Sequence, residues 1–467
     1  MIIENENYFH KFYTKDLLLP IVLTAFSVIF LLFASNIYVA LLLVPIAIVS
    51  ISIYFPLATF SVVISSLFIP LLISRFFVSI PIAFLIPISF LISYRNISLK
   101  DFKHANTMGI LIYFISIIPS LLNSIKVSTS LLLLLNFFTT VYIFYISLVV
   151  FDNTKKIFTI IKFFLFMVLA NSAHVIFDGI INSKRAFGFG GIMFVDYVGI
   201  AIIISIVSMF LMKDFKKYIF AALLIIFSIS SLITQTRTSW LTTIITIIFL
   251  ALFLVKNSQK VKIKKIYLVT SIFLLIGISS IVFFYLKGVS ATFEDRVTQI
   301  NQLDVAFDKE GKAQNSLITR LMIWHTAYNA FRSHPLIGIG VNSFPFASGG
   351  YYAIPKFLYE DYVKGLTPHQ TFIAVLAETG FLGFFGFVIM LLYFIRTTFI
   401  QFNLAKDHDE VEMSMIIFGI NTYILFSMFV TDCWLWGHGA ILWGLALGFA
   451  GANRNILEKK YTANLNE

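Results

Sequence analysis

The sequence is a succession of apolar runs, most of them about 20 residues long, with short polar stretches between them. A run of this length can cross a bilayer as a helix, whose backbone groups bond to one another where no water is present. Hydrophobic residues make up 59% of the chain and charged residues only 12%, against about 25% charged residues in a soluble domain. We therefore predict an all-α polytopic membrane protein with about 12–14 transmembrane helices, since the second to fourth runs are barely separated. The predicted segments are 17–34, 37–53, 56–73, 76–94, 107–123, 130–151, 157–178, 194–212, 216–234, 238–255, 266–286, 370–397, 413–431 and 435–451.

The positions of the basic residues predict the orientation of these segments. The net charge of +11 comes from short clusters between apolar runs, which is typical of membrane topology and argues against a nucleic-acid partner. With the N-terminus in the cytoplasm, the inner side collects twenty Lys and Arg residues, whereas the short outer loops collect five. Both termini are then cytoplasmic, and the polar stretch 287–368 lies outside. The five outer residues are Arg75, Lys126, Lys184, Arg185 and Arg237.

The chain accordingly divides into three parts: N-terminal transmembrane helices at 1–286, a large extracytoplasmic loop at 287–368, and C-terminal transmembrane helices with a cytoplasmic tail at 369–467. Within the loop, an amphipathic helix is predicted to begin at Asn315 or Ser316, both of which can cap it, and to end before Pro335. Its apolar stripe is expected to lie on the bilayer interface or against the helical bundle. The stripe consists of Leu317, Leu321, Trp324, Tyr328 and Phe331.

The last part opens with Thr-Pro-His-Gln at 367–370. Thr367 and Gln370 have the spacing of a capping box, and Pro368 suits the first helical position. His369 would then lie in the first turn of a helix, where the positive end of the helix dipole favours a neutral imidazole. A neutral imidazole can accept a proton from a hydroxyl. A histidine that only caps its helix remains the alternative.

Two arginines have unusual surroundings. Arg237 lies between two apolar runs with almost no loop, in the polar cluster Thr-Gln-Thr-Arg-Thr-Ser at 234–239. Such a cluster can hold a guanidinium toward a phosphate, although an arginine at a membrane boundary can also reach lipid headgroups. Arg320 lies one helical turn before Trp324, at the edge of the aromatic stripe.

Three pieces of the sequence, taken in order, resemble the O-antigen ligase and polymerase superfamily of bacterial envelope enzymes. The first is Thr-Arg-Thr-Ser-Trp around Arg237. The second is Arg320 and Trp324 followed by H-P-L-x-G-x-G-x-x-x-F at 334–344. The third is His369 followed by A-E-T-G-x-x-G at 377–383. Together they span about 150 residues; Gln370 stands where the superfamily usually has Asn.

The resemblance implies an integral glycosyltransferase of GT-C-like architecture on the outer face of the bacterial inner membrane. It would pass a glycan from undecaprenyl pyrophosphate to an acceptor sugar, without a metal ion or other cofactor. Arg237 and Arg320 would hold the pyrophosphate, and His369 would be the catalytic base. A chain-length regulator and a flippase would be further partners. The other residues implied in substrate binding are Arg185, Trp324, Gln370 and Asp196.

A polymerase of O-antigen, capsule or exopolysaccharide repeat units is the first interpretation. A ligase that attaches finished glycan to lipid A–core or another acceptor is the alternative, since both need the same donor chemistry. A polysaccharide flippase or transporter is disfavoured by the few charges within the spans and the absence of matched halves. Secondary candidates for binding or for orienting polar groups are Lys184, His174, Asp178, Tyr197, His334, Glu378 and Asp432.

Overall fold

The structure, a computed structural model, describes residues 104–182, 186–188, 191–212, 215–261, 316–432 and 437–463, with isolated positions between 57 and 68. All regular elements in these ranges are helices, which confirms the predicted all-α class. Seven of them are long and apolar enough to cross a membrane. The helices are α6 (Ala105–Ile117), η3 (Ile118–Asn123), α7 (Val127–Val150), α8 (Thr154–Asn182), η4 (Gly191–Met193), α9 (Phe194–Leu211), α10 (Lys216–Ile233), α11 (Arg237–Lys256), α12 (Ser258–Val261), α15 (Ser316–Ser333), α16 (Phe344–Ala347), η5 (Ser348–Gly350), α17 (Lys356–Tyr362), α18 (Thr371–Leu404), α19 (His408–Ser427) and α20 (Gly437–Ala463).

Nine predicted segments correspond to these helices, from 107–123, now α6 with η3, to 435–451, now α20. Their limits agree within about five residues, except that α18 continues to Leu404 instead of 397 and α20 continues to Ala463 instead of 451. The segments α19 and α20 are part of the bundle but are not among the seven most apolar spans. The predicted segments before residue 104 and at 266–286 lie outside the described residues, apart from the isolated positions in 56–73. The total of about 12–14 spans therefore stays a prediction.

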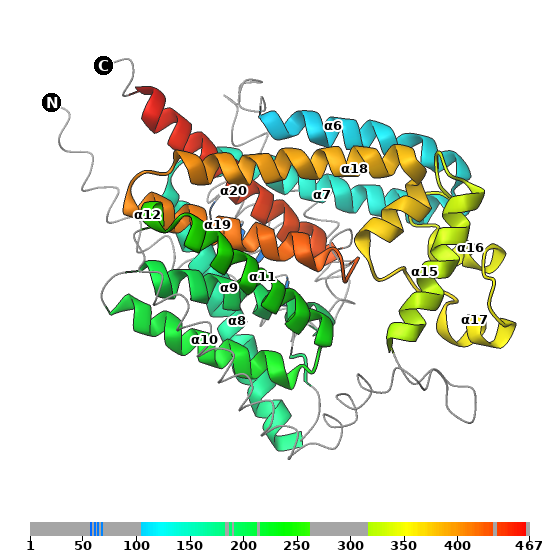
Figure 1. Cartoon of the computed structure of the whole chain (residues 1–467), viewed down its shortest axis with the longest axis horizontal. Coiled ribbons are helices and arrows are strands. Elements are labelled where there is room, and N and C mark those ends of the chain that lie inside the picture. The colour runs from blue at the N-terminus through cyan, green and yellow to red at the C-terminus, as the bar shows by residue number, and fades with distance from the viewer. Residues whose placement is uncertain are drawn as a thin grey trace, which may run out of the picture.

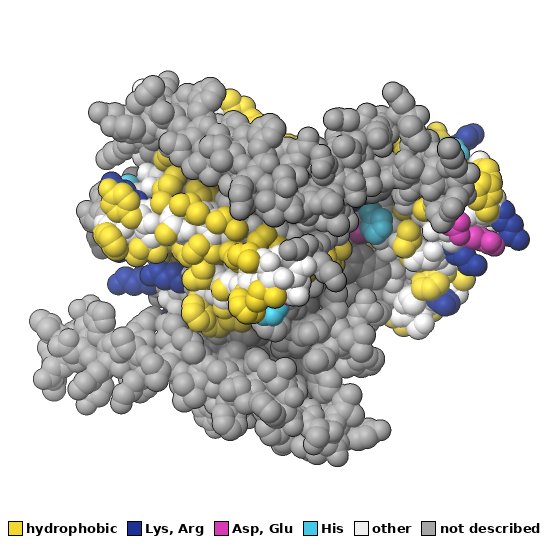
Figure 2. Space-filling view, turned by 90° about the horizontal axis from the view of Figure 1, so that it is seen from below, with side chains coloured by type: hydrophobic (Ala, Val, Ile, Leu, Met, Phe, Trp, Pro, Cys, Tyr) yellow, Lys and Arg dark blue, Asp and Glu magenta, His cyan; other side chains and the backbone are white. Residues whose placement is uncertain are grey.

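The long helices form a bundle in which α6 packs along α18, α7 along α20, and α9 against α10 and α19 (Figure 1). The start of α11, the start of α18 and the end of α19 lie toward the end of the bundle that carries α15, α16 and α17, whereas the C-terminus lies at the opposite end (Figure 1). Figure 2 shows hydrophobic side chains along the described flank of the bundle and charged side chains gathered toward its two ends. This distribution suits a bilayer around the middle of the bundle.

The segment that carries α15, α16 and α17, called the outer segment because it lies beyond the end of the helical bundle, has a small core of its own. Ile323, Ala327 and Ala330 form the buried face of α15, and they pack with Phe344 of α16 and with Val363, which follows α17. The predicted apolar stripe is a different face: Leu321 and Tyr328 are exposed, and the side chain of Leu317 lies outside the described residues. The predicted limits of α15 are confirmed. Packing of the whole stripe against the bundle is wrong, since Leu321 and Tyr328 are exposed, whereas the alternative position at the bilayer interface stays a prediction.

Helix α18 is broken at Gly380, where φ is 65° and ψ is −166°. The loop that follows α15 crosses this break and bonds to both sides of it. The amides of Ile339 and Gly340 donate to the carbonyls of residues 377 and 378 at 3.1 and 3.0 Å. The amides of Phe381 and Leu382 donate to the carbonyls of residues 335 and 336 at 2.8 and 3.1 Å. The loop therefore replaces the backbone bonds that the break removes from the helix.

Glycine is required on both sides of the backbone junction where the loop after α15 crosses the break in α18. A β-carbon on Gly338 would lie 2.3 Å from the carbonyl carbon of Glu378, and one on Gly380 would lie 2.5 Å from that of Leu336. The two glycine motifs noted in the sequence, 334–344 and 377–383, are thus the two halves of one backbone junction. Their close approach fixes the outer segment on the bundle.

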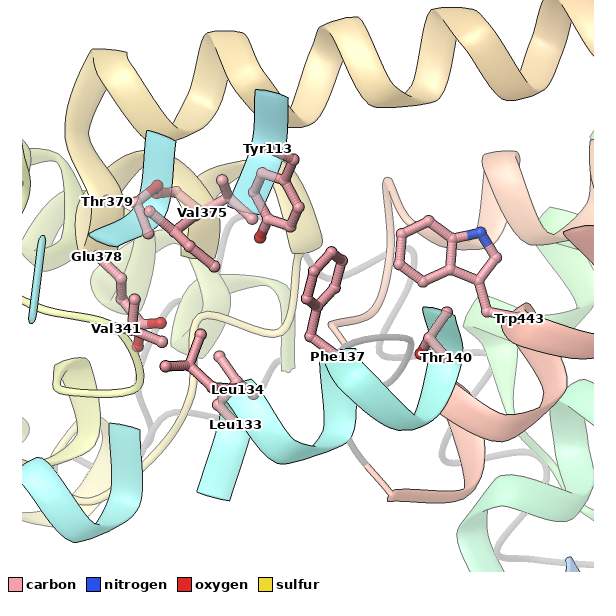
Figure 3. A pocket seen from close by; sticks show the side chains of 11 residues that line it. Tyr113, Leu133, Leu134, Phe137, Thr140, Val341, Val375, Glu378, Thr379 and Trp443 are labelled. Carbon is pink, nitrogen blue, oxygen red and sulfur yellow. The ribbon is translucent and has the colours of Figure 1, made fainter. Parts of the chain in front are cut away.

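The carboxylate of Glu378 completes the junction. Its two oxygens accept the amides of Asn342 at 2.8 Å and Phe344 at 3.2 Å. An enclosed cavity of about 20 Å³ lies beside it, with Glu378 and Thr379 at one side and Trp443 at the other (Figure 3). A cavity of that volume holds roughly one water molecule, so it is no substrate site. Glu378 therefore lies in the wall between the outer loop and the bundle core.

Candidate functional site

His369 does not lie in a helix, contrary to the prediction from Thr367 and Pro368. Helix α18 begins at Thr371 and its N-cap is Gln370, whose side chain accepts the amide of Ile373. The predicted capping box at Thr367 is therefore wrong. His369 has φ of 53°, in the left-handed region, which costs energy for any residue but glycine. Tertiary contacts hold it in that conformation.

The carboxylate of Asp432 supplies the main contact. The backbone N–H of His369 donates to Asp432 Oδ2 at 3.1 Å, and His369 Nδ1 lies 4.0 Å from Asp432 Oδ1. The Thr367 hydroxyl lies 3.4 Å from the same Nδ1. The histidine side chain is 44% exposed and that of Asp432 only 9%. The imidazole is thus accessible, while the group that positions it is enclosed.

Helix α15 contributes the next two residues. The indole N–H of Trp324 donates to the carbonyl of Pro368 at 2.9 Å, which ties this helix to the residue before the histidine. Arg320 lies one turn earlier, within electrostatic range of both His369 and Asp432. The structure therefore brings together a guanidinium, a carboxylate and an imidazole from three separate parts of the chain.

The surroundings of His369 favour the neutral imidazole. Burial is the largest influence and lowers its pKa; the Arg320 guanidinium lowers the pKa further, and the Asp432 carboxylate opposes both. Burial also lowers the pKa of Arg320, and Asp432 opposes this shift; an arginine nevertheless stays charged in proteins. The predicted first-turn position does not apply, because α18 begins only at Thr371; burial and Arg320 are what shift the pKa of His369 toward the neutral form. The site thus pairs a proton acceptor with a permanent positive charge.

Arg237 is the first residue of α11 and belongs to an adjoining cluster. Two residues later, the Ser239 hydroxyl donates to the Val195 carbonyl at 2.8 Å and lies 3.4 Å from Tyr423 Oη. The hydroxyls of Tyr423 and Ser427 each lie 3.2 Å from the Oδ1 of buried Asp196 and donate to it.

The end of α19 joins the two clusters. Beyond Ser427, the carbonyls of Met428 and Thr431 accept the amide of Thr371 at 3.0 and 3.1 Å, and Asp432 follows at once. The start of α11, to which Arg237 belongs, therefore contacts α19 through Ser239, and the chain that follows α19 leads to Asp432 beside His369.

An apolar cavity reaches this junction from within the bundle. It has a volume of about 200 Å³ and lies between α11, α18, α19 and α20. Its lining includes Met428, whose carbonyl bonds to the start of α18. Its lining is almost entirely aliphatic and aromatic, so it suits a hydrocarbon chain rather than a sugar. Its other lining residues include Phe249, Leu391, Phe399, Phe418 and Leu425.

The remaining candidates separate into two groups. Gln370 caps α18, and His334 packs its ring edge-on against Tyr351 at 6.0 Å, so both have structural roles. Asp178 accepts a bond from Asn182 and, with His174, lies on α8. Tyr197 is buried in α9. Lys184 and Arg185 lie outside the described residues. Within the described part of the chain, no three His, Cys, Asp or Glu side chains gather as metal ligands would.

Sequence reasoning gave Asp432 only a secondary place, as a residue that orients other polar groups. Its contact with His369 joins positions 63 residues apart. The sequence offered one signal, an acidic residue in the short turn between two predicted spans. Nothing in that turn indicated which polar group the acid would meet.

Comparison with known families gives one match: residues 220–388 match the model of the O-antigen ligase family. The matched region covers α10 to the first half of α18 and includes Arg237, Arg320 and His369. No curated protein sequence matches the chain. The matched region ends before α19, so Asp432 lies outside it.

Proposed function

Because residues 220–388 place this multi-pass membrane protein in the O-antigen ligase and polymerase superfamily, we propose that it transfers a glycan from undecaprenyl pyrophosphate to a sugar hydroxyl. The observation that carries the proposal is an accessible His369 imidazole 4.0 Å from the Asp432 carboxylate and within electrostatic range of Arg320. A general base and a positive charge are the two groups that displacement of a pyrophosphate requires.

In the proposed reaction the acceptor hydroxyl loses its proton to His369 while its oxygen attacks the anomeric carbon. The bond from that carbon to the pyrophosphate oxygen breaks, and the pyrophosphate leaves with the electron pair. His369 Nδ1 faces Thr367 and Asp432, which leaves Nε2 to receive the proton. Asp432 then stabilises the imidazolium that forms. Attack opposite the leaving group inverts the anomeric carbon.

The leaving pyrophosphate gains negative charge, and guanidinium groups hold such charge in a fixed, bidentate geometry. Arg320 is the first of these groups, and Arg237 from the adjoining cluster is the second. Two guanidiniums supply charge that other glycosyltransferases take from a metal ion, so we propose metal-independent transfer.

The donor's polyprenyl tail needs an apolar environment beside the polar site. The cavity between α11, α18, α19 and α20 offers one, since its lining includes Met428, whose carbonyl bonds to the start of α18. The proposed orientation places this end of the bundle and the loop 287–368 outside the cytoplasm of a bacterial cell, with both termini inside. Regulators of chain length and a flippase for the donor are proposed partners.

A polymerase and a ligase differ in the acceptor, so one assay separates them. The purified protein in lipid nanodiscs is incubated with the lipid-linked repeat unit alone. Longer lipid-linked chains mean a polymerase, which is the outcome we expect; product formed only after addition of a separate acceptor means a ligase. His369→Ala should abolish either product, and the matched control His325→Ala, on the exposed face of α15, should retain it. Transfer by His369→Ala at the normal rate would remove the histidine from the mechanism.

A further inference from the structure

A second polar cleft lies on the outer segment, at the far end of α15 from Arg320. It has a volume of about 400 Å³ and opens between the last turns of α15 and the chain that leaves η5. It is distinct from the apolar cavity described above, because amide, hydroxyl, phenol and guanidinium groups line it. The lining residues are Asn329, Arg332, Ser333, Gly350, Tyr351 and Tyr352.

Contacts with neighbouring residues hold Tyr351 and Tyr352, the two aromatic residues that line the cleft. The ring of Tyr352 stacks on that of buried Tyr359, with centroids 4.2 Å apart and planes 14° apart. The Tyr359 hydroxyl in turn lies 3.0 Å from the Ser348 hydroxyl. The Asn329 side chain donates to the Tyr351 carbonyl at 3.1 Å, and the Tyr351 ring lies edge-on to that of His334, with centroids 6.0 Å apart. The two tyrosines are therefore held in place before any ligand binds, which reduces the entropy lost on binding.

This combination of groups suits a sugar. The C–H face of a pyranose packs on an aromatic ring, and its hydroxyls bond to amide, hydroxyl and guanidinium groups. A phosphate ligand would favour several cations, but Arg332 is the one cation in the cleft, and it lies over the Tyr328 ring at 6.0 Å. A lipid chain would favour an apolar lining, which the cleft lacks.

The cleft is connected to the reaction centre along one row of α15. Arg320, Trp324, Tyr328 and Arg332 follow one another at intervals of four residues, so each lies about one turn beyond the last. Twelve residues of helix measure about 18 Å at 1.5 Å per residue, which is the length of a short oligosaccharide. Tyr328 is 54% exposed, so its ring is open to a chain that follows this row.

We propose that the cleft around Tyr351 and Tyr352 is a glycan subsite, which binds a sugar several units away from the one that reacts at His369. The inference rests on the proposed transfer of a glycan. Remote binding of this kind lets a long glycan bind better than a short one, since the additional sugars contribute contacts that a short chain cannot reach. The cleft thereby gives the site a preference for longer chains.

The test uses the full-length protein in nanodiscs and oligosaccharides released from the surface polysaccharide of the cell that makes it. Binding of a single repeat unit and of a chain of several units is measured by calorimetry. Tyr352→Ala and Arg332→Gln should each weaken binding of the long chain about tenfold, close to 1.4 kcal/mol, and leave the single unit unaffected. Arg332→Gln leaves the Tyr352–Tyr359 stack intact, so it also tests the cleft if Tyr352→Ala unfolds. Lys356→Ala, a control on exposed α17, should bind like the wild type.

Equal binding of the long chain by Arg332→Gln, Lys356→Ala and the wild type would overturn the subsite, whatever the transfer assay shows. Weakened binding by the cleft variants would support the subsite even if the wild type transfers no glycan from a lipid-linked donor. In that second case the proposed function fails and the cleft remains a glycan-binding site. The two proposals are thus tested separately.

Discussion

Replacing Gly380 by alanine would place a methyl group where the loop after α15 crosses the break in α18. The added carbon would lie 2.5 Å from the carbonyl carbon and oxygen of Leu336 and 2.6 Å from the amide nitrogen of Gly338. These are backbone atoms, so no side chain can rotate away to make room. The loop must move away from the helix, and its hydrogen bonds across the break must lengthen.

Two contributions set the free-energy cost of Gly380→Ala. The backbone of Gly380, with φ of 65° and ψ of −166°, lies in a region that is essentially restricted to glycine, which costs an alanine about 1–3 kcal/mol. Forcing a methyl group into a filled space costs about 1–3 kcal/mol more. The junction should therefore lose about 2–6 kcal/mol, which raises its local opening about 30-fold to 10⁴-fold at about 1.4 kcal/mol per factor of ten.

Amide hydrogen exchange, followed by mass spectrometry in nanodiscs, measures this opening directly. The amides of Ile339 and Gly340 and those of Phe381 and Leu382 bond across the break, so peptides that contain them should exchange faster in Gly380→Ala. Glycan transfer should fall with the loss of protection, because α15 carries Arg320.

Gly365→Ala is the matched control. Gly365 also has a positive φ, of 77°, but an added carbon there meets nothing within 4 Å. Its cost is backbone strain alone, and exchange across the junction should stay at the wild-type rate. Wild-type exchange around residues 339 and 381 in Gly380→Ala would refute the reasoning, since the junction would then not depend on close backbone contact.

Three further predictions concern the reaction centre. In the proposed mechanism, transfer requires neutral His369 and should decline as pH falls through the pKa of His369, which burial sets below the ordinary value of 6.5. Asp432→Asn removes an influence that raises this pKa and should move the decline to lower pH. Arg320→Gln removes an influence that lowers this pKa and should move the residual decline to higher pH. Shifts of the same sign in the two pH–rate profiles would contradict the assignment of charges. Trp324→Phe keeps an aromatic ring but loses the hydrogen bond to the loop, worth about 0.5–1.5 kcal/mol, so kcat/KM should fall by up to roughly tenfold at unchanged protein abundance; an unchanged kcat/KM would show that the bond does not position the site. Arg237→Ala should abolish transfer while folded protein remains in the membrane, as judged by its elution in detergent, and normal glycan chains from this variant would exclude the arginine from pyrophosphate binding.

The sequence predicts the helices well because the bilayer requires each of them to be a long apolar run. A chain that crosses a bilayer needs a long apolar run for each span, so the limits of α9 and α11 are readable within a few residues. The same applies to α15, where Ser316 and Pro335 mark the two ends. These features depend on local sequence alone, and no knowledge of distant contacts is needed to predict them.

The candidate site is less readable because distant contacts decide it. Thr367, Pro368 and Gln370 carry the local signals of a helix start, yet contacts from Asp432 and Trp324 accompany a helix that begins only at Thr371. A tertiary contact of this kind overrides capping preferences worth about 1 kcal/mol.

The two glycine motifs illustrate the same limit. Their residue types indicate tight backbone geometry, but only the structure shows that the two segments contact each other. Their spacing along the chain carries no such information.

The start of α18 is fastened at both ends. The amide and hydroxyl of Thr371 bond to carbonyls at the end of α19. Nine residues later, the loop after α15 forms backbone hydrogen bonds on both sides of the break at Gly380. This short piece of helix cannot tilt or unwind without breaking one of the two attachments. His369 immediately precedes this anchored piece of helix, so in the proposed reaction the histidine would keep its position and the sugar chain would move relative to it.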